Sequence, residues 1–233
     1  MGDPKDRIAA VVGGTGVVGN SLLTCLLKQD RYEKIFVLTR REINYGDPRV
    51  EVLVVDFENL EKEGKRFQAH EYFCCLGTSS VREVESYRKV DYEYVLSFAH
   101  LAQDDSLCRH FLLLTSVGAS PSSGIYYNRI KGEVERDVKV LDIPGIHIFR
   151  PSLLLGKREK PRIWEEIGKI FSSILSFLMI GSRGKFLAIE ADKVAFAMMH
   201  VAMDDKTGIH VYSTRAMYAL NREKLLTTKK LVL

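Results

Sequence analysis

Three polar residues in the middle of the chain have the types and the spacing of a proton-transfer site. Tyr127 and Lys131 are four positions apart in a helical pattern, so both side chains project from one face of the expected helix. A lysine ammonium beside a phenol stabilises the phenolate and lowers its pKa from about 10 toward neutrality. Such a tyrosine exchanges a proton with a carbonyl or alcohol oxygen, and Ser116, at the end of an expected strand, can hydrogen-bond the same oxygen. We therefore predict that Ser116, Tyr127 and Lys131 are catalytic, with a solvated helix face as the alternative for Y-x-x-x-K.

A glycine-rich stretch near the N-terminus has the pattern of a dinucleotide-binding turn. The sequence VVGGTGVVG follows a short apolar run and leads directly into a helical pattern. Glycines let the backbone turn tightly against a pyrophosphate, and a helix that begins there directs its free N–H groups at the phosphates. We expect Gly13, Gly16 and the first helical residues, Val17 and Val18, to bind these phosphates. A strand, turn and helix without a ligand is the alternative for this motif taken alone.

The ends of three further expected strands carry residues suited to a nucleotide. After the second strand, Arg40 and Arg41 stand where an acidic residue would select NAD. A guanidinium binds the 2′-phosphate of NADP through paired, charge-assisted hydrogen bonds, so we predict NADP(H) as the cofactor, with solvated loop arginines as the alternative. We predict that Asp56 and Phe57, after the third strand, contact the adenine. After the fourth strand, the backbone at Leu76, Gly77 and Thr78 is expected to approach the cofactor closely.

These side chains require a frame in which strands alternate with helices. Apolar runs of strand length begin near residues 8, 34, 50, 72, 111 and 146, and helical patterns cover 83–103 and 125–140. Strands that are apolar on both faces and separated by helices indicate a buried parallel sheet of right-handed βαβ units. The expected fold class is α/β, a doubly wound parallel sheet (Rossmann). Residues 1–233 are expected to form a single domain, in which 152–233 add a small C-terminal lobe on the substrate side.

Composition excludes several classes of protein. The net charge is only +4, and the basic residues are interleaved with acidic ones, which argues against a nucleic-acid binder. The histidines form no ligand-spaced pair, so no metal site is expected. Four cysteines without C-x-x-C spacing, together with no recognisable signal peptide, predict a cytoplasmic location.

One apolar segment stands apart from the sheet pattern. The run from Ile167 to Gly181 is shorter than the roughly 20 residues that span a bilayer, so no transmembrane segment is expected. We interpret it as a core or subunit-facing helix, through which a protein partner or a second copy could bind. A helix lying on a membrane surface is the alternative.

The motifs GGTGVVG, LLLTSVGAS, YYNRIKGEVE and FRPSLLLG resemble those of the short-chain dehydrogenase/reductase superfamily, in its extended and atypical branches. Within it, VDFE, FCCLGT and VDYEYVL are similar to the group of Tat-interacting-protein-like oxidoreductases, over about residues 7–157. This resemblance implies a Rossmann fold, NADPH binding and a Ser-Tyr-Lys site. It also implies that Thr15, Leu153, Tyr127 and Lys131 contact the cofactor. One position departs from the superfamily, because Asp91 stands where many members have an asparagine in a proton relay.

Three functions are compatible with these features. The first is an NADP-dependent oxidoreductase that transfers a hydride between NADPH and a carbonyl or alcohol substrate, which is not identified by the sequence. The second is an NADPH-binding regulatory or protein-interaction module with little turnover, suggested by Asp91 and by the apolar segment 167–181. The third and minor alternative is an epimerase or dehydratase of nucleotide-sugars, for which the expected C-terminal lobe leaves limited room.

Overall fold

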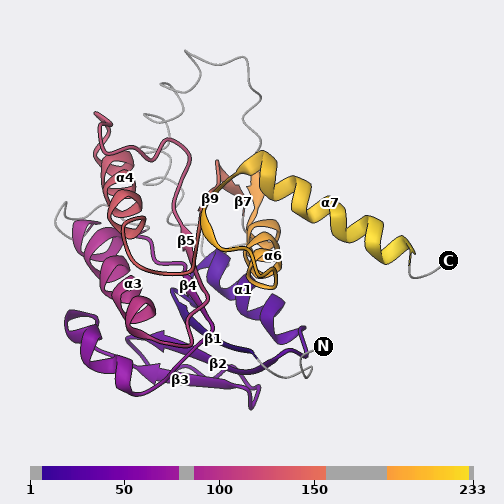
Figure 1. Ribbon diagram of the computed structural model, residues 1–233, viewed down its shortest axis with the longest axis horizontal. Coiled ribbons are helices and arrows are strands. Elements are labelled where there is room, and N and C mark those ends of the chain that lie inside the picture. Colours follow the sequence, from indigo (N-terminus) through magenta and orange to yellow (C-terminus); the bar gives the residue numbers. More distant parts are fainter. Residues whose placement is uncertain (1–6, 79–86, 156–187, 231–233) are drawn as a thin grey trace.

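A seven-stranded sheet forms the centre of the computed structural model, which describes residues 7–78, 87–155 and 188–230 (Figure 1). All neighbouring strands are parallel, in the order β3-β2-β1-β4-β5-β6-β9. The strands are β1 (Arg7–Val12), β2 (Tyr32–Thr39), β3 (Val50–Val54), β4 (Glu71–Cys74), β5 (His110–Leu114), β6 (Gly145–Arg150) and β9 (Gly208–Ser213). The order reverses between β1 and β4, so the predicted doubly wound α/β fold is confirmed.

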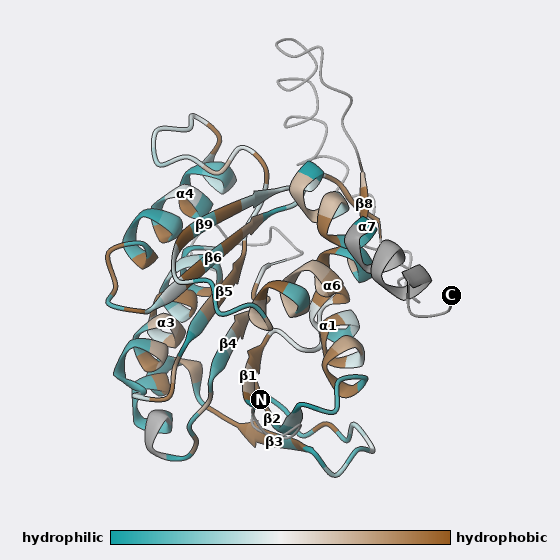
Figure 2. Ribbon diagram, turned by 45° about the vertical axis from the view of Figure 1, so that its right-hand side comes forward, coloured by the Kyte–Doolittle hydropathy of each residue, from teal (hydrophilic) through white to brown (hydrophobic). Residues whose placement is uncertain are grey.

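Helices cover both faces of this sheet, as Figures 1 and 2 show from two directions. One face carries α1 (Val17–Leu27) and α6 (Ala191–Ala202), which pack against each other, and α7 (Thr214–Lys230) packs on α6. The other face carries α3 (Tyr94–Asp104), α4 (Tyr126–Val138) and the short 3₁₀ helix η1 (Phe57–Lys65). Outside the main sheet, β7 (Leu154–Leu155) pairs with β8 (Ile189–Glu190).

The strands send alternate side chains into two apolar layers, one beneath each set of helices. In β4, Tyr72 belongs to the layer under α3 and α4, and Phe73 to the layer under α1 and α6. In β5, Phe111 and Leu112 alternate in the same way. All four side chains are almost completely buried. Burial on both faces explains why these strands read as continuous apolar runs in the sequence.

The strand register brings the carboxyl ends of the strands to one edge of the sheet. Leu38 of β2 and Cys74 of β4 both pair with Val12 of β1. Cys74 in turn pairs with Leu113 of β5, which pairs with Ile148 of β6. The predicted site residues at 13–18, 40–41, 76–78, 116 and 153 all follow a strand on this side. Ligands of open α/β sheets bind along such an edge.

The structure changes the interpretation of two predicted segments. The helix predicted over 83–103 ends as α3, but its first described turn, η2 (Lys89–Glu93), is a π-helix. In the predicted C-terminal lobe, β9 extends the main sheet beside β6 and α6 packs on α1, so these parts complete the main layers. The apolar segment Ile167–Gly181 lies outside the described residues, and its predicted role stays a prediction.

A chain of buried histidines lies in the sheet away from the carboxyl edge. The Nε2 atom of His147 in β6 is 3.1 Å from Nδ1 of His110, and its Nδ1 atom is 3.2 Å from the Tyr212 hydroxyl. Burial, together with the charge repulsion of His110, lowers the pKa of His147 to about 3. An unfolded histidine has a pKa of about 6.5. The unfolded chain therefore binds a proton that the fold excludes, and the fold loses stability as the pH falls from about 6.5 toward 3.

We expect His147→Gln to flatten this acid dependence. Between about pH 7 and pH 5, exclusion of one proton from His147 lowers the free energy of unfolding by about 2 kcal/mol, and glutamine does not titrate. Urea unfolding at the two pH values measures the difference. His100→Gln, a partly exposed histidine on α3, serves as the control and should keep the wild-type slope. Equal pH slopes for wild type and His147→Gln would contradict the assignment.

Candidate active site

The glycine turn between β1 and α1 leaves no space for side chains. Gly13 has φ +76°, in the left-handed region, and a Cβ there would lie 2.4 Å from the carbonyl oxygen of Cys75. A Cβ on Gly19 would lie 2.1 Å from the carbonyl oxygen of Gly13. The turn is closed by the N–H of Gly16, which donates to the Gly13 carbonyl at 3.0 Å. This close backbone packing is what a dinucleotide-binding turn requires.

The first turn of α1 is open to an anion. Its N-cap residue is Gly16, no side chain caps the helix, and no acidic residue lies in the first turn. The amides of Val17 and Val18 therefore have neither an intrahelical acceptor nor a capping side chain. Together with the positive end of the helix dipole they fit the pyrophosphate of a dinucleotide. Thr15 is exposed beside them, and the individual contacts stay predictions.

The two arginines after β2 are placed to receive a further phosphate. Arg40 and Arg41 are both exposed at the carboxyl edge of the sheet. Within the described part of the chain, neither guanidinium forms an ion pair with a carboxylate. The Arg41 N–H donates to the Thr39 hydroxyl at 3.4 Å, which ties this loop to the end of β2. Both side chains are thus free of competing acidic groups among these residues.

The predicted adenine contacts have structural partners of their own. Asp56 is the N-cap of η1, and its carboxylate accepts from the Glu58 N–H at 3.0 Å and from the Asn59 side-chain amide at 2.7 Å. Phe57 is only 7% exposed, and its ring packs 5.3 Å from that of Tyr94. Asp56 therefore remains exposed at the sheet edge, whereas Phe57 belongs mainly to the core. Their contact with adenine stays a prediction.

The predicted catalytic residues lie together beside the end of β4. Tyr127 and Lys131 are on one face of α4, and the Ser116 hydroxyl, after β5, lies near the Tyr127 phenol, buried and without a hydrogen-bond partner among the described residues. The Lys131 ammonium lies 2.7 Å from Oδ1 of Asp91, and both side chains are buried. It also donates to the Leu76 carbonyl at 3.4 Å.

The loop after β4 is tied to the same pair of charges. The N–H of Thr78 donates to Oδ2 of Asp91 at 2.9 Å. Gly77, between Leu76 and Thr78, is exposed. A Cβ on Gly77 would lie 3.7 Å from Oδ1 of Asp91, an ordinary van der Waals contact. The predicted cofactor contacts 76–78 and the predicted catalytic lysine therefore form one connected unit.

The predicted fall in the pKa of Tyr127 is wrong. Burial raises this pKa above its ordinary value, the Lys131 charge and the Ser116 hydroxyl act to lower it, and the Asp91 charge adds to the rise. Burial also acts to lower the pKa of Lys131, but Asp91 and Tyr127 raise it well above its ordinary value. The ammonium therefore stays charged, but the negative charge of the Asp91 carboxylate offsets its effect on the phenol. Burial is the main reason that the phenol keeps its proton, and this carboxylate adds to the effect by offsetting the Lys131 charge.

The chain resembles proteins that are already known. No family model matches the chain. Protein HTATIP2 of Rattus norvegicus is 37% identical over 172 residues, which cover 72% of this chain and 71% of the rat protein. The chain belongs to the HTATIP2 family. Fungal members include the FMP52 protein of Debaryomyces hansenii, 30% identical over 208 residues, which cover 85% of this chain and 89% of that protein.

Solved structures show that this member of the HTATIP2 family has a Rossmann-type α/β fold. The Bordetella bronchiseptica enzyme WbmF, solved with NAD+, aligns with a TM-score of 0.65 over 90% of this chain and 73% of that chain, at 17% identity. A UDP-glucose 4-epimerase of Thermotoga maritima aligns with a TM-score of 0.65 over 88% of this chain and 76% of that chain, at 16% identity. At these identities the likeness concerns the fold alone.

The family corrects the predicted cytoplasmic location. Relatives from Eremothecium gossypii, Debaryomyces hansenii and Saccharomyces cerevisiae are all named FMP52, mitochondrial. The four cysteines are free, as expected in a reducing compartment, but this property does not distinguish one reducing compartment from another. Among the helices of the described residues, none is long and apolar enough to cross a membrane.

A buried polar network beneath the catalytic residues has no counterpart in the sequence predictions. Glu135 of α4 is 1% exposed and accepts from the Thr115 hydroxyl at 2.7 Å and from the Arg150 guanidinium at 2.9 Å. This network holds α4 against the ends of β5 and β6. Tyr127, Lys131 and Glu135 are spaced four apart and follow one stripe of the helix. An acidic residue within the buried stripe of an amphipathic helix is the signal that points to such a network.

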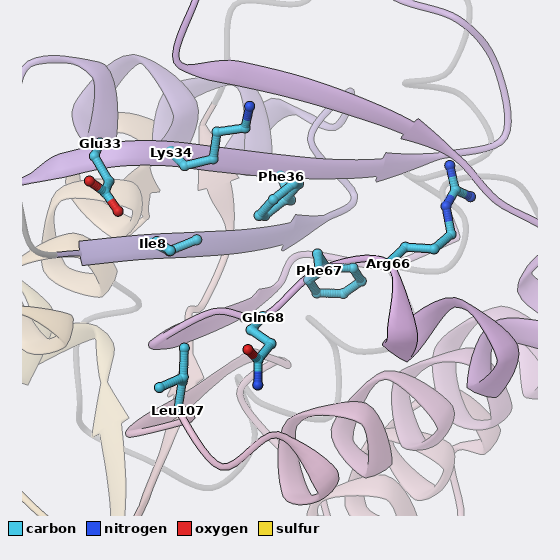
Figure 3. A pocket seen from close by; sticks show the side chains of 8 residues that line it. All are labelled: Ile8, Glu33, Lys34, Phe36, Arg66, Phe67, Gln68 and Leu107. Carbon is cyan, nitrogen blue, oxygen red and sulfur yellow. The ribbon is translucent and has the colours of Figure 1, made fainter.

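A separate hollow of about 830 Å³ lies over β1 and β2, and its lining runs from Glu33 at the start of β2 to Arg66, whose guanidinium donates to the Val54 carbonyl at the end of β3 (Figure 3). Its lining combines apolar rings and alkyl groups with charged and amide side chains: Ile8, Phe36, Phe67, Leu107, Glu33, Lys34, Arg66 and Gln68. None of the predicted cofactor or catalytic residues lines it. The hollow is therefore distinct from the candidate active site.

Proposed function

We propose that this protein is an oxidoreductase that uses a nicotinamide dinucleotide to interconvert a carbonyl compound and its alcohol. The observation that carries the proposal is the assembly of Ser116, Tyr127 and Lys131 on the sheet edge where the uncapped N-terminus of α1 opens. The HTATIP2 family and a fold shared with enzymes solved with NAD+ or NADH support it.

Different residues of this chain have different roles in such a reaction. When bound, the dinucleotide supplies or accepts the hydride. Tyr127 donates its phenolic proton to the carbonyl oxygen, and Ser116 hydrogen-bonds the same oxygen to fix its position. The uncapped turn at Gly16, Val17 and Val18 binds the pyrophosphate. Lys131 spans the site between Leu76 and Asp91, where it holds the cofactor loop and the catalytic helix together.

An assay of carbonyl reduction tests this function directly. The protein is incubated with NADPH and a panel of aldehydes and ketones, and the loss of the reduced nicotinamide absorbance is recorded. Turnover of at least one carbonyl compound, with formation of its alcohol, is the expected result. NADPH binding without any turnover would instead favour an NADPH-dependent regulatory module, the second candidate, which the raised pKa of Tyr127 supports. UDP-glucose in the same panel tests the epimerase alternative.

We further propose that the cofactor is NADP(H) rather than NAD(H), because Arg40 and Arg41 have no competing carboxylate partner among the described residues. We expect Arg40→Asp to weaken NADPH binding by about 10- to 100-fold, since a hydrogen bond to a charged group contributes roughly 1.5–3 kcal/mol. NADH binding should change little. Thermal-shift titrations with both nucleotides measure the two affinities.

The control for this substitution is Arg109→Asp, which makes the same charge change beside the amino-terminal end of β5. It should leave the preference for NADPH intact. If Arg40→Asp and Arg41→Asp both kept the wild-type ratio of NADPH to NADH affinity, the proposed 2′-phosphate site would be wrong.

A further inference from the structure

The catalytic lysine of this chain is held as half of a buried ion pair. Its ammonium lies 2.7 Å from Oδ1 of Asp91, and the two side chains are 3% and 1% exposed. Oδ2 of the same carboxylate accepts the Thr78 N–H at 2.9 Å, so Asp91 is fixed from both sides. A phenol near this pair experiences two opposite charges rather than a single positive one.

The local backbone places Asp91 in this position. Residues Lys89–Glu93 form a π-helical turn, and Asp91 at its centre is completely buried. A π turn adds one residue to the helical repeat and is frequent at functional sites, because it redirects a side chain. The turn packs against α4, which carries Lys131.

Few titratable groups face the Tyr127 phenol from the elements around it. Lys131 comes from α4 and Asp91 from η2, while the Tyr87 ring packs edge-on at 6.3 Å. Burial raises the pKa of Tyr87 to about 12, so this neighbour is uncharged near neutrality. Ser116, after β5, is polar and uncharged, and Cys74 of β4 is buried with a raised pKa. Among the described residues, the Lys131–Asp91 pair therefore supplies the charges that act on the phenol.

We propose that Asp91 is a positioning residue that neutralises Lys131 and thereby keeps Tyr127 protonated, so that Tyr127 acts as the acid of carbonyl reduction near neutral pH. This inference rests on the proposed oxidoreductase function and adds to it the protonation state in which Tyr127 begins the reaction. Alcohol oxidation needs the phenolate before the reaction begins, and the ion pair keeps that form scarce.

The reductive step balances in atoms and electrons. The carbonyl carbon gains a hydride, which a bound nicotinamide cofactor would supply and for which it would be oxidised. The carbonyl oxygen gains the proton of Tyr127 as the phenolic O–H bond breaks and the alcohol O–H bond forms. The resulting phenolate then takes a proton from solvent, which restores Tyr127 for the next cycle. In the oxidative direction, that protonation must first be reversed, and this requires alkaline pH.

Titration of Tyr127 in the free protein tests the inference without any turnover. Tyrosines carrying a carbon label on the phenol ring are followed by NMR as the pH rises, and Tyr127→Phe identifies the signal. In wild type we expect a midpoint above the ordinary value of about 10. In Asp91→Asn, which keeps the shape and removes the negative charge, the midpoint should fall by about 1–3 units. Asp137→Asn, which alters another carboxylate between α4 and η2 that accepts from the Tyr92 hydroxyl, should leave it unchanged.

Two results would overturn the inference. One is a wild-type Tyr127 midpoint below that of a free tyrosine, which needs only the wild-type fold. The other is an unchanged midpoint in folded Asp91→Asn. In the enzyme assay, Asp91→Asn should shift the pH at which alcohol oxidation reaches half its maximal rate downward by about one unit for each unit of pKa lost. A wild type that titrates as expected but turns over no carbonyl compound would refute the proposed function and the assigned role of Tyr127 as the acid, and would leave the charge pairing established.

Discussion

Tyr127→Phe is expected to lower kcat for carbonyl reduction by about 10²–10⁴-fold, the usual contribution of a general acid. Phenylalanine keeps the ring that packs edge-on against Tyr87 and removes only the hydroxyl that carries the proton. The fold should therefore be retained, and far-UV circular dichroism and the melting temperature check this. Binding of NADPH should change little, because the proposed pyrophosphate-binding residues lie at the glycine turn. Steady-state kinetics with the best carbonyl substrate measure the effect.

The adjacent tyrosine provides a matched control for this prediction. The residue four positions after Tyr126 is Ile130, which carries no charge, and the Tyr126 ring lies under the Arg129 guanidinium, 5.3 Å away. Tyr126→Phe should leave kcat within about twofold of wild type, since surface changes away from the chemistry cost little. A Tyr127→Phe enzyme with wild-type kcat would refute the assignment of the acid. Equal losses in both variants would point to a general disturbance of α4.

The frame of the site is predictable because it depends on local patterns. Strands buried on both faces must be apolar throughout, and parallel strands need helical crossovers, so the order of elements follows from the periodicity. The glycine turn is predictable for a similar reason, because the left-handed backbone of Gly13, with φ +76°, favours glycine. The placement of Tyr127 and Lys131 is predictable because two residues four positions apart lie on the same face of a helix.

The electrostatics of the site are not predictable in this way. Asp91 and Lys131 are forty positions apart, and only the π turn and the packing of η2 on α4 bring their side chains together. A Y-x-x-x-K pattern therefore predicts a lysine that lowers the tyrosine pKa, whereas the folded chain produces the opposite net result. The hydrogen bonds of Glu135 are not predictable for the same reason, since its partners Thr115 and Arg150 lie at the ends of two different strands.

The location of the protein illustrates a different limit. Free cysteines and a modest net charge describe the chemical environment that the chain tolerates, and these properties are shared by several reducing compartments. The mitochondrial names of the fungal relatives carry information that no buried contact or strand pattern contains.

Gly13→Ala is expected to abolish most dinucleotide binding. The residue has φ +76°, where an L side chain costs about 1–2 kcal/mol, and its Cβ would lie 2.4 Å from a backbone carbonyl that cannot rotate away. The turn must therefore open and carry the first turn of α1 away from the pyrophosphate. Loss of two charge-assisted hydrogen bonds, roughly 3 kcal/mol or more, weakens NADPH binding by about 100-fold or more. Isothermal titration calorimetry measures this change.

A second glycine separates the effect of contact from that of backbone strain. Gly46 has φ +70°, but a Cβ there would meet nothing within 4 Å. Gly46→Ala therefore carries the strain alone, about 1 kcal/mol, or roughly 2–4 °C in Tm for a chain of this size. It should bind NADPH like wild type, whereas Gly13→Ala should lose more stability and nearly all of the affinity. If the two variants lost affinity equally, strain in the loops would account for the loss, and the close contact of Gly13 with Cys75 would not be what shapes the phosphate site.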